Sequence, residues 1–107
     1  MTDPTLETLA GTIAARRKES SEPSYTRQLL DGGTSRCAKK FGEEAVETVI
    51  AALSEDDAAL TREAADLVFH LLVLLESRHI PVANVLSELD RRMGTSGLAE
   101  KAARQRS

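Results

Sequence analysis

Four carboxylates lie in two pairs, and the members of each pair are separated by about one helical turn. Glu47 follows Glu44 by three residues, and Asp66 follows Glu63 at the same interval. Residues three or four apart share one face of an α-helix, so two helices would each present a pair. Brought together, these groups would repel by about 4 kcal/mol per pair at about 4 Å and an effective dielectric constant of about 20. Mg²⁺ would remove that repulsion and binds substrate phosphates as well, so the spacing predicts phosphate chemistry.

Asp66 stands in an unusually apolar segment. Ten of the twelve residues from Ala64 to Leu75 are apolar, and a helix of this composition is expected to be buried on every side. A buried carboxylate needs a cation or another partner, because leaving it unpaired is energetically costly. A salt bridge to Lys or Arg is the structural alternative to a metal ion. His70 is expected to be a core histidine or to contact a carboxylate, rather than to bind Mg²⁺.

The first carboxylate pair lies in a glutamate-rich segment that has a second interpretation. Glu43, Glu44 and Glu47 could form an ordinary solvated helix face, because Glu favours helices. They lie beside an apolar arc of the same helix rather than within it. The arc consists of Val46, Val49, Ile50 and Leu53.

Basic side chains near the first pair are candidates for binding phosphate groups. Lys40 is favoured, because it lies on the same arc of the predicted helix as Glu44. The alternative is a solvated lysine that pairs with Glu44 across one helical turn. Tyr25 precedes a glycine-containing loop and could offer its hydroxyl to the substrate or be a buried aromatic. The full set of substrate-binding candidates is Tyr25, Arg27, Arg36, Lys39 and Lys40.

The elements that must position these residues are all helical. Almost no segment shows the alternation of a half-buried strand, so the sequence predicts an all-α fold. Thr34 is expected to cap the helix that carries the first carboxylate pair. Periodicity, caps and breaks place helices at about 4–19, 24–30, 34–53, 54–78 and 81–93, and a short helix or frayed tail from about 97.

These helices are expected to form one domain over residues 1–107, because neither a repeat nor a long linker divides the chain. The two carboxylate helices would face each other in a bundle, as is common for metal sites in helical proteins. The segment from Ala64 to Leu75 carries more apolar surface than its neighbours can cover. We therefore expect a homodimer to complete a fold of the four-helix-bundle type.

The composition argues against several classes of partner. The formal net charge is −3 and only 3% of residues are aromatic, so nucleic acid is not an expected partner. No apolar stretch reaches the roughly 18 residues of a membrane span, so a membrane is not expected either. One cysteine, Cys37, and an N-terminus without signal-peptide character predict a cytoplasmic protein.

The order of the motifs resembles the all-α NTP pyrophosphatase superfamily, which includes MazG-like enzymes and dimeric dUTPases. Within it, the chain looks like the phosphoribosyl-ATP pyrophosphohydrolase family, which performs the second step of histidine biosynthesis. The match spans Ser24 to Arg92. It rests on Ser-Tyr-Thr at 24–26, the glycines at 32 and 33, Lys-Lys-Phe-Gly-Glu-Glu-Ala-Val-Glu-Thr at 39–48 and Glu-Ala-Ala-Asp-Leu-Val-Phe-His-Leu at 63–71.

This resemblance implies Mg²⁺-dependent hydrolysis of phosphoribosyl-ATP to phosphoribosyl-AMP and pyrophosphate by a dimer or larger assembly. By position, it implies that Glu44, Glu47, Glu63 and Asp66 are metal ligands. Glu43 or Glu47 is the candidate to orient or deprotonate the attacking water. Two alternatives stay open. The chain could be a pyrophosphohydrolase for another nucleotide, or a non-catalytic dimerising helical module in which Asp66 pairs with a basic side chain and Mg²⁺ has no effect.

Overall fold

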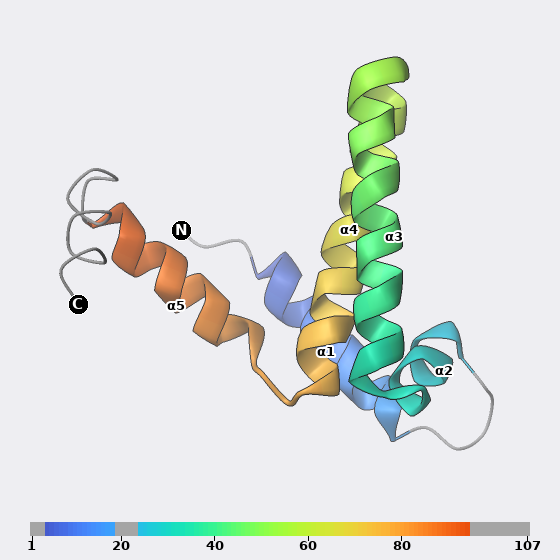
Figure 1. Ribbon diagram of the computed structural model, residues 1–107. Coiled ribbons are helices and arrows are strands. Elements are labelled where there is room, and N and C mark those ends of the chain that lie inside the picture. The colour runs from blue at the N-terminus through green and yellow to red at the C-terminus, as the bar shows by residue number, and fades with distance from the viewer. Residues whose placement is uncertain (1–3, 19–23, 95–107) are drawn as a thin grey trace, which may run out of the picture.

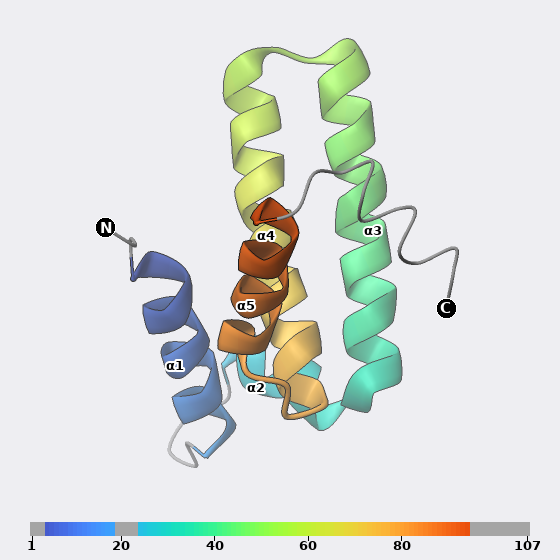
Figure 2. The ribbon, with the colours of Figure 1, turned by 90° about the vertical axis from the view of Figure 1, so that its left-hand side faces the viewer.

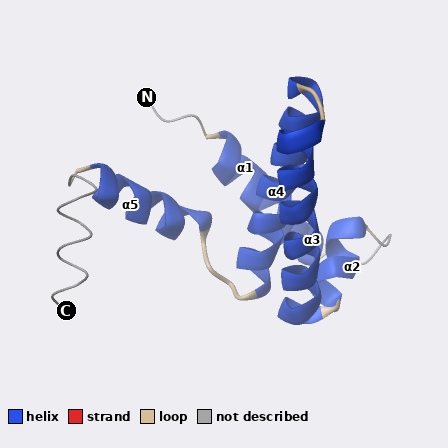
Figure 3. Cartoon of the chain, turned by 45° about the horizontal axis from the view of Figure 1, so that its top comes forward, coloured by secondary structure: helices blue, strands red, loops and turns tan. Residues whose placement is uncertain are grey.

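The computed structural model describes residues 4–18 and 24–94, and every regular element in these ranges is an α-helix (Figure 1, Figure 3). The expected all-α class is therefore confirmed. None of the described helices is long and apolar enough to cross a membrane. The expected end of the first helix at Glu19 and the tail from residue 97 fall outside the described residues. The helices are α1 (Thr5–Arg17), α2 (Tyr25–Asp31), α3 (Gly33–Ser54), α4 (Asp57–Ser77) and α5 (Val82–Met93).

Side-chain caps fix the starts of two helices. Ser24 Oγ accepts a hydrogen bond from Arg27 N at 3.0 Å at the start of α2. Asp56 Oδ1 accepts one from Ala59 N at 2.8 Å at the start of α4. Each bond satisfies a backbone N–H that has no partner within its own helix. These local signals explain why the sequence places both helices to within a few residues.

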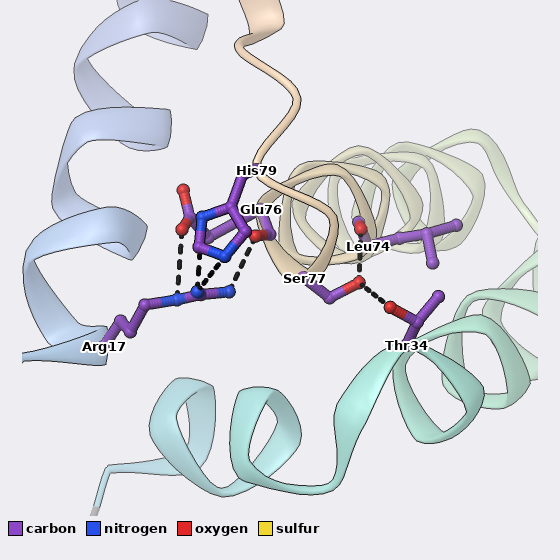
Figure 4. Close-up of polar contacts among 6 residues, drawn as sticks. All are labelled: Arg17, Thr34, Leu74, Glu76, Ser77 and His79. Atoms are coloured by element: carbon purple, nitrogen blue, oxygen red, sulfur yellow. Dashed lines mark hydrogen bonds and ion pairs between the residues drawn. The ribbon is translucent and has the colours of Figure 1, made fainter.

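The expectation that Thr34 caps the third helix is wrong. Gly32 is the N-cap residue of α3, and Thr34 lies inside the first turn with its Oγ1 3.0 Å from Ser77 Oγ on α4 (Figure 4). Gly33 has a φ of +82°, a left-handed conformation that favours glycine. The chain therefore turns from α2 into α3 without a separate loop. Helix α3 begins one residue before Thr34, the residue expected to cap it.

Helices α3 and α4 form a long antiparallel hairpin (Figure 2). The buried residues of α3 are Cys37, Glu44 and Ala51, which recur at seven-residue spacing and so lie on one face. Ala51 is fully buried and small, which lets the two helices approach closely. The glutamate-rich segment is thus not simply a solvated face, because Glu44 points into the hairpin.

The apolar arc of α3 faces outward in the single chain. Its residues are between 49% and 82% exposed, although all four have large apolar side chains. Contiguous exposed apolar surface of this kind is unusual on a monomeric protein. The residues are Val46, Val49, Ile50 and Leu53.

A small core joins the five helices at the lower end of the hairpin in Figure 1. Cys37 packs in this core as a small side chain, and its Sγ donates to Leu29 O at 3.2 Å. Burial raises the pKa of the Cys37 thiol, so the thiol stays protonated and its role is packing. The buried core residues are Ile13, Leu29, Leu30, Cys37, Leu72, Val73 and Val82.

Arg17, the last residue of α1, holds that helix against the C-terminal end of α4 (Figure 4). Its Nε lies 3.1 Å from Glu76 Oε2, and its Nη2 donates to Glu76 O at 2.7 Å. Its Nη1 lies 2.8 Å from His79 Nε2. A guanidinium at a helix C-terminus satisfies free carbonyls and complements the negative end of the helix dipole. This contact fixes the angle of α1 across the hairpin.

Helix α5 departs from the expected bundle arrangement. It leads away from the other helices after the turn at Pro81, as Figure 1 shows. One face is apolar, yet Leu89 is 47% and Met93 77% exposed. A helix of 12 residues is only marginally stable in water without packing. The apolar face of α5 therefore adds to the surface that the single chain leaves uncovered.

Candidate active site

Three of the predicted ligand residues meet across the hairpin. Glu44 on α3 and Glu63 and Asp66 on α4 each offer a carboxylate oxygen, and these oxygens all lie within 4.8 Å of one another. Antiparallel packing produces this meeting, because it sets the middle of α3 beside the first half of α4. Glu47 lies one turn after Glu44 and is exposed. The adjacent carboxylate of Glu44, and the charge of Glu63, raise the pKa of Glu47.

The expectation that Asp66 is buried is wrong for the single chain. Asp66 is exposed, Glu63 is half-buried and Glu44 is buried, with only 6% of its surface exposed. Val68, which follows Asp66 on α4, is 38% exposed. The composition of α4 suggested burial on all sides, but the described helices leave Asp66 and Val68 exposed. Glu44 is therefore the carboxylate that most needs a compensating charge.

Two carboxylate oxygens in the cluster lack partners. Glu44 Oε2 and Glu63 Oε2 are buried and make no hydrogen bond in the described part of the chain. Leaving a buried charged acceptor unsatisfied costs about 1–3 kcal/mol or more. Both atoms belong to the cluster whose donors are all carboxylate oxygens, the ligands that Mg²⁺ prefers. The residues present therefore fit a hard divalent cation.

The other oxygen of Glu44 already contacts the protein. Lys40 Nζ lies 3.3 Å from Glu44 Oε1, and His70 Nε2 lies 3.8 Å from the same oxygen. The hydrogen bond to Glu44 raises the pKa of Lys40, and burial lowers the pKa of His70. Tyr25 OH lies 3.5 Å from His70 Nε2, at the edge of hydrogen-bonding distance. Lys40 and His70 therefore both approach Oε1 of Glu44, and Oε2 is the oxygen without a partner.

A groove of about 470 Å³ runs between α2 and the first half of α3. Lys40 lines it and also contacts Glu44, so one residue of the groove wall touches the carboxylate cluster. Three cationic side chains in its wall, Arg36, Lys39 and Lys40, suit a polyphosphate. The predicted site residues found in the lining are Tyr25, Arg36, Lys39, Lys40 and Glu43.

Arg27 does not line this groove. Its Nε lies 3.6 Å from Asp31 Oδ2 on α2, so the structure pairs it with its own helix. Another hollow, of about 390 Å³, lies between α1 and the segment that joins α4 to α5. Its lining includes Glu7 and Glu76 but neither lysine nor arginine, so it suits a polyphosphate less well than the groove does.

Sequence reasoning missed three residues of the groove: Leu29, Gly32 and Ser35. Ser35 lies four residues before Lys39 and eight before Glu43, so helical spacing alone could have found it. Gly32 was interpreted as a break between helices and as part of the family match, and not as a residue of the groove. A Cβ at this position would collide with the side chain of Arg36, so glycine is what lets Arg36 fold back along the start of α3.

Comparison with known proteins agrees with this arrangement. Residues 6–93 match the family model described as phosphoribosyl-ATP pyrophosphohydrolase. A phosphoribosyl-ATP pyrophosphatase from Rhizorhabdus wittichii is 59% identical over 100 residues, which are 94% of this chain and 94% of the relative. One from Zymomonas mobilis is 56% identical over the full length of both chains, and one from Rhodobacter capsulatus is 54% identical over 92% of this chain and 96% of the relative. On this similarity and its carboxylate cluster, the chain belongs to the phosphoribosyl-ATP pyrophosphohydrolase family.

Proposed function

We propose that this chain hydrolyses phosphoribosyl-ATP to phosphoribosyl-AMP and pyrophosphate, the second step of histidine biosynthesis, in the cytoplasm and with Mg²⁺. One observation in the structure of this chain supports the proposal. Two buried carboxylate oxygens without partners, on Glu44 and Glu63, belong to an acidic cluster that Lys40 joins to a cationic groove. An acidic cluster alone would suit many cations, whereas the groove adds a place for phosphates.

Glu44, Glu63 and Asp66 would hold the ion, and Glu47 stands beside Glu44 as a fourth carboxylate. When bound, Mg²⁺ supplies positive charge against the triphosphate and the departing pyrophosphate. Asp66 is exposed and Glu44 buried, so the cluster has one open side from which substrate phosphates can approach. Lys40 would keep Glu44 in place by the contact already described.

The products require that water cleaves the anhydride between the α- and β-phosphates. We propose that water attacks the α-phosphorus while the bond between the α-phosphorus and the bridging oxygen breaks. The electron pair of that bond leaves on pyrophosphate, and a carboxylate takes a proton from the water. Glu43 and Glu47 are the candidates. Glu43 Oε1 lies 3.9 Å from Lys40 Nζ, whereas Glu47 lies against the cluster itself. We favour Glu47 because of this position.

The groove cations are proposed to bind the phosphates. Both interpretations of Lys40 agree with the structure, since it pairs with Glu44 and also lines the groove. We expect Lys40→Met to lower kcat/KM for phosphoribosyl-ATP by about tenfold or more, because a charge-assisted contact contributes about 1.5–3 kcal/mol. Steady-state kinetics would measure the change, with Lys18→Met, an exposed lysine at the end of α1, as the matched control. If Lys40→Met and Lys18→Met have the same kcat/KM, Lys40 forms only a surface ion pair and does not bind phosphate.

A second copy of the chain is proposed to cover the exposed apolar arc of α3. Leu53 is 82% exposed, so Leu53→Asp should cost the single chain little and should disfavour the interface strongly. We expect light scattering to give the mass of a dimer for the wild type and a single-chain mass for Leu53→Asp at micromolar concentration. Thr12→Asp on the exposed side of α1 is the control and should stay dimeric. A wild type with single-chain mass would contradict the homodimer.

Two other functions would use parts of the same arrangement. A pyrophosphohydrolase for another nucleotide would need the same carboxylates, so only substrate tests separate it from the proposal. A non-catalytic helical module would pair Asp66 with a basic side chain, yet no ion pair of Asp66 exists among residues 4–18 and 24–94. The exposed, unpaired Asp66 counts against that module.

The deciding experiment compares substrates. Purified protein is incubated with phosphoribosyl-ATP and with a panel of nucleoside triphosphates, with and without Mg²⁺, and pyrophosphate release is followed by phosphorus-31 NMR. Mg²⁺-dependent release that is selective for phosphoribosyl-ATP supports the proposal. Selective release from another nucleotide would keep the metal chemistry and reassign the substrate. The absence of release from every substrate would favour the non-catalytic module.

A further inference from the structure

One hydroxyl links the backbones of two carboxylate residues on different helices. Thr48 Oγ1 donates to Glu44 O on α3 at 2.8 Å, and Glu63 O on α4 lies 3.3 Å from the same oxygen. Thr48 is half-buried, one turn after Glu44 on the face of α3 that meets α4. Its hydroxyl carries a single hydrogen, so the two carbonyls share it.

This pattern differs from that of three other helical hydroxyls in the described chain, although Thr34 and Ser77 also join α3 to α4, ten residues before Glu44 along α3. Thr12, Ser54 and Thr61 each donate to the carbonyl four residues earlier, at 2.8–3.1 Å. Such bonds are common on helices and stay within one helix. Thr48 makes the same bond and also reaches the neighbouring helix, at the residue that supplies a cluster carboxylate. The second contact therefore couples the positions of α3 and α4 at the level of the site.

The cluster needs such a coupling when no cation is bound. Carboxylates whose oxygens lie within 4.8 Å repel one another, and the repulsion acts to separate α3 from α4. Mg²⁺ in turn demands ligands at about 2.0–2.1 Å in nearly ideal octahedral geometry. If the distance between α3 and α4 changed by a few tenths of an ångström, the site would bind Mg²⁺ less tightly. Ala51, fully buried one turn further along α3, permits the close approach but cannot hold it by hydrogen bonding.

We propose that Thr48 is a positioning residue, whose hydroxyl holds α3 and α4 at the separation that the divalent-cation site requires. This inference rests on the proposed function, because it assigns Thr48 to the cation site of Glu44, Glu63 and Asp66. Thr48 does not contact the ion or the substrate in this role. It acts through the backbones of Glu44 and Glu63, whose side chains it sets relative to one another.

The test measures Mg²⁺ affinity directly, by isothermal titration calorimetry on metal-free protein. Thr48→Val removes the hydroxyl and keeps the shape, and Thr48→Ser keeps the hydroxyl. We expect Thr48→Val to raise the dissociation constant of Mg²⁺ by about tenfold, at the low end of the effect of groups that orient metal ligands. Thr48→Ser should bind Mg²⁺ within about twofold of wild type. Thr61→Val, which removes a bond confined to α4, is the matched control and should bind as wild type does.

Kinetics and stability separate positioning from simple packing. At saturating Mg²⁺, Thr48→Val should recover most of its kcat, because the lost affinity is for the ion. A structural role alone would lower the free energy of unfolding in urea and leave the Mg²⁺ dissociation constant unchanged, which would overturn the inference. Equal weakening in Thr48→Ser and Thr48→Val would also overturn it. If Thr48→Val fails to fold, Thr48→Ala, which lacks the same hydroxyl without adding a methyl group, is measured in its place with the same expected weakening.

Failure of the inference is distinguishable from failure of the proposed function. If the wild type itself does not bind Mg²⁺, the cation site is wrong and Thr48 has nothing to position. If the wild type binds and Thr48→Val binds equally well, the site stands and the role of Thr48 is wrong.

Discussion

Asp66→Asn is expected to reduce Mg²⁺-dependent turnover of phosphoribosyl-ATP by about 100-fold or more. The substitution keeps the shape of the side chain and removes the charge of the one exposed carboxylate in the cluster. A metal contact that contributes several kcal/mol to transition-state stabilisation, at about 1.4 kcal/mol per tenfold, accounts for a loss of this size. Rates of pyrophosphate release at saturating substrate would measure it.

The same substitution is expected to affect the stability of the metal-free protein in the opposite direction, by maintaining or raising it. Because Asp66 is exposed and close to Glu44 and Glu63, removing its charge relieves repulsion. The melting temperature of metal-free Asp66→Asn should therefore equal or exceed that of the wild type. Asp90→Asn, at an exposed position on α5, controls for the chemical change and should keep full activity. Near-normal turnover in Asp66→Asn would remove Asp66 from the ligand set.

Adding Mg²⁺ to metal-free protein is expected to raise the melting temperature by on the order of 10 °C. A ligand that binds only the folded state at 100 times its dissociation constant stabilises it by about 2.7 kcal/mol. For a domain of this size, each kcal/mol corresponds to about 4–8 °C. The unpartnered Glu44 Oε2 and Glu63 Oε2 are the atoms that gain a partner. Thermal melts followed by circular dichroism would record the shift.

The control for this shift is chemical and reversible. Excess EDTA should return the protein to its metal-free melting temperature, and Asp66→Asn should show little response to Mg²⁺. A non-catalytic helical module predicts the same melting temperature with and without the ion. Equal temperatures for the wild type in both conditions would therefore favour that module over the proposed hydrolase.

The helices and the family could be predicted from the sequence because their signals are local or ordered along the chain. Ser24 and Asp56 cap helices through bonds to residues three positions away, and these bonds need no tertiary contact. The order of the carboxylate motifs, from Glu44 to Asp66, indicated the family that the comparisons confirm. Local rules failed where a residue of another helix made a contact, as at Thr34, whose hydroxyl contacts Ser77 instead of capping α3.

The sequence by itself determined that two helices would each carry a pair of carboxylates, because three-residue spacing fixes a shared helix face. Only the tertiary structure decided which carboxylate is buried. Glu44 is buried and Asp66 exposed, although the surroundings of Asp66 are the more apolar. Burial depends on which face another element covers, and helical periodicity leaves that undetermined. For the same reason, the second contact of Thr48 and the groove beside Lys40 appear only when α3 packs against α4 and α2.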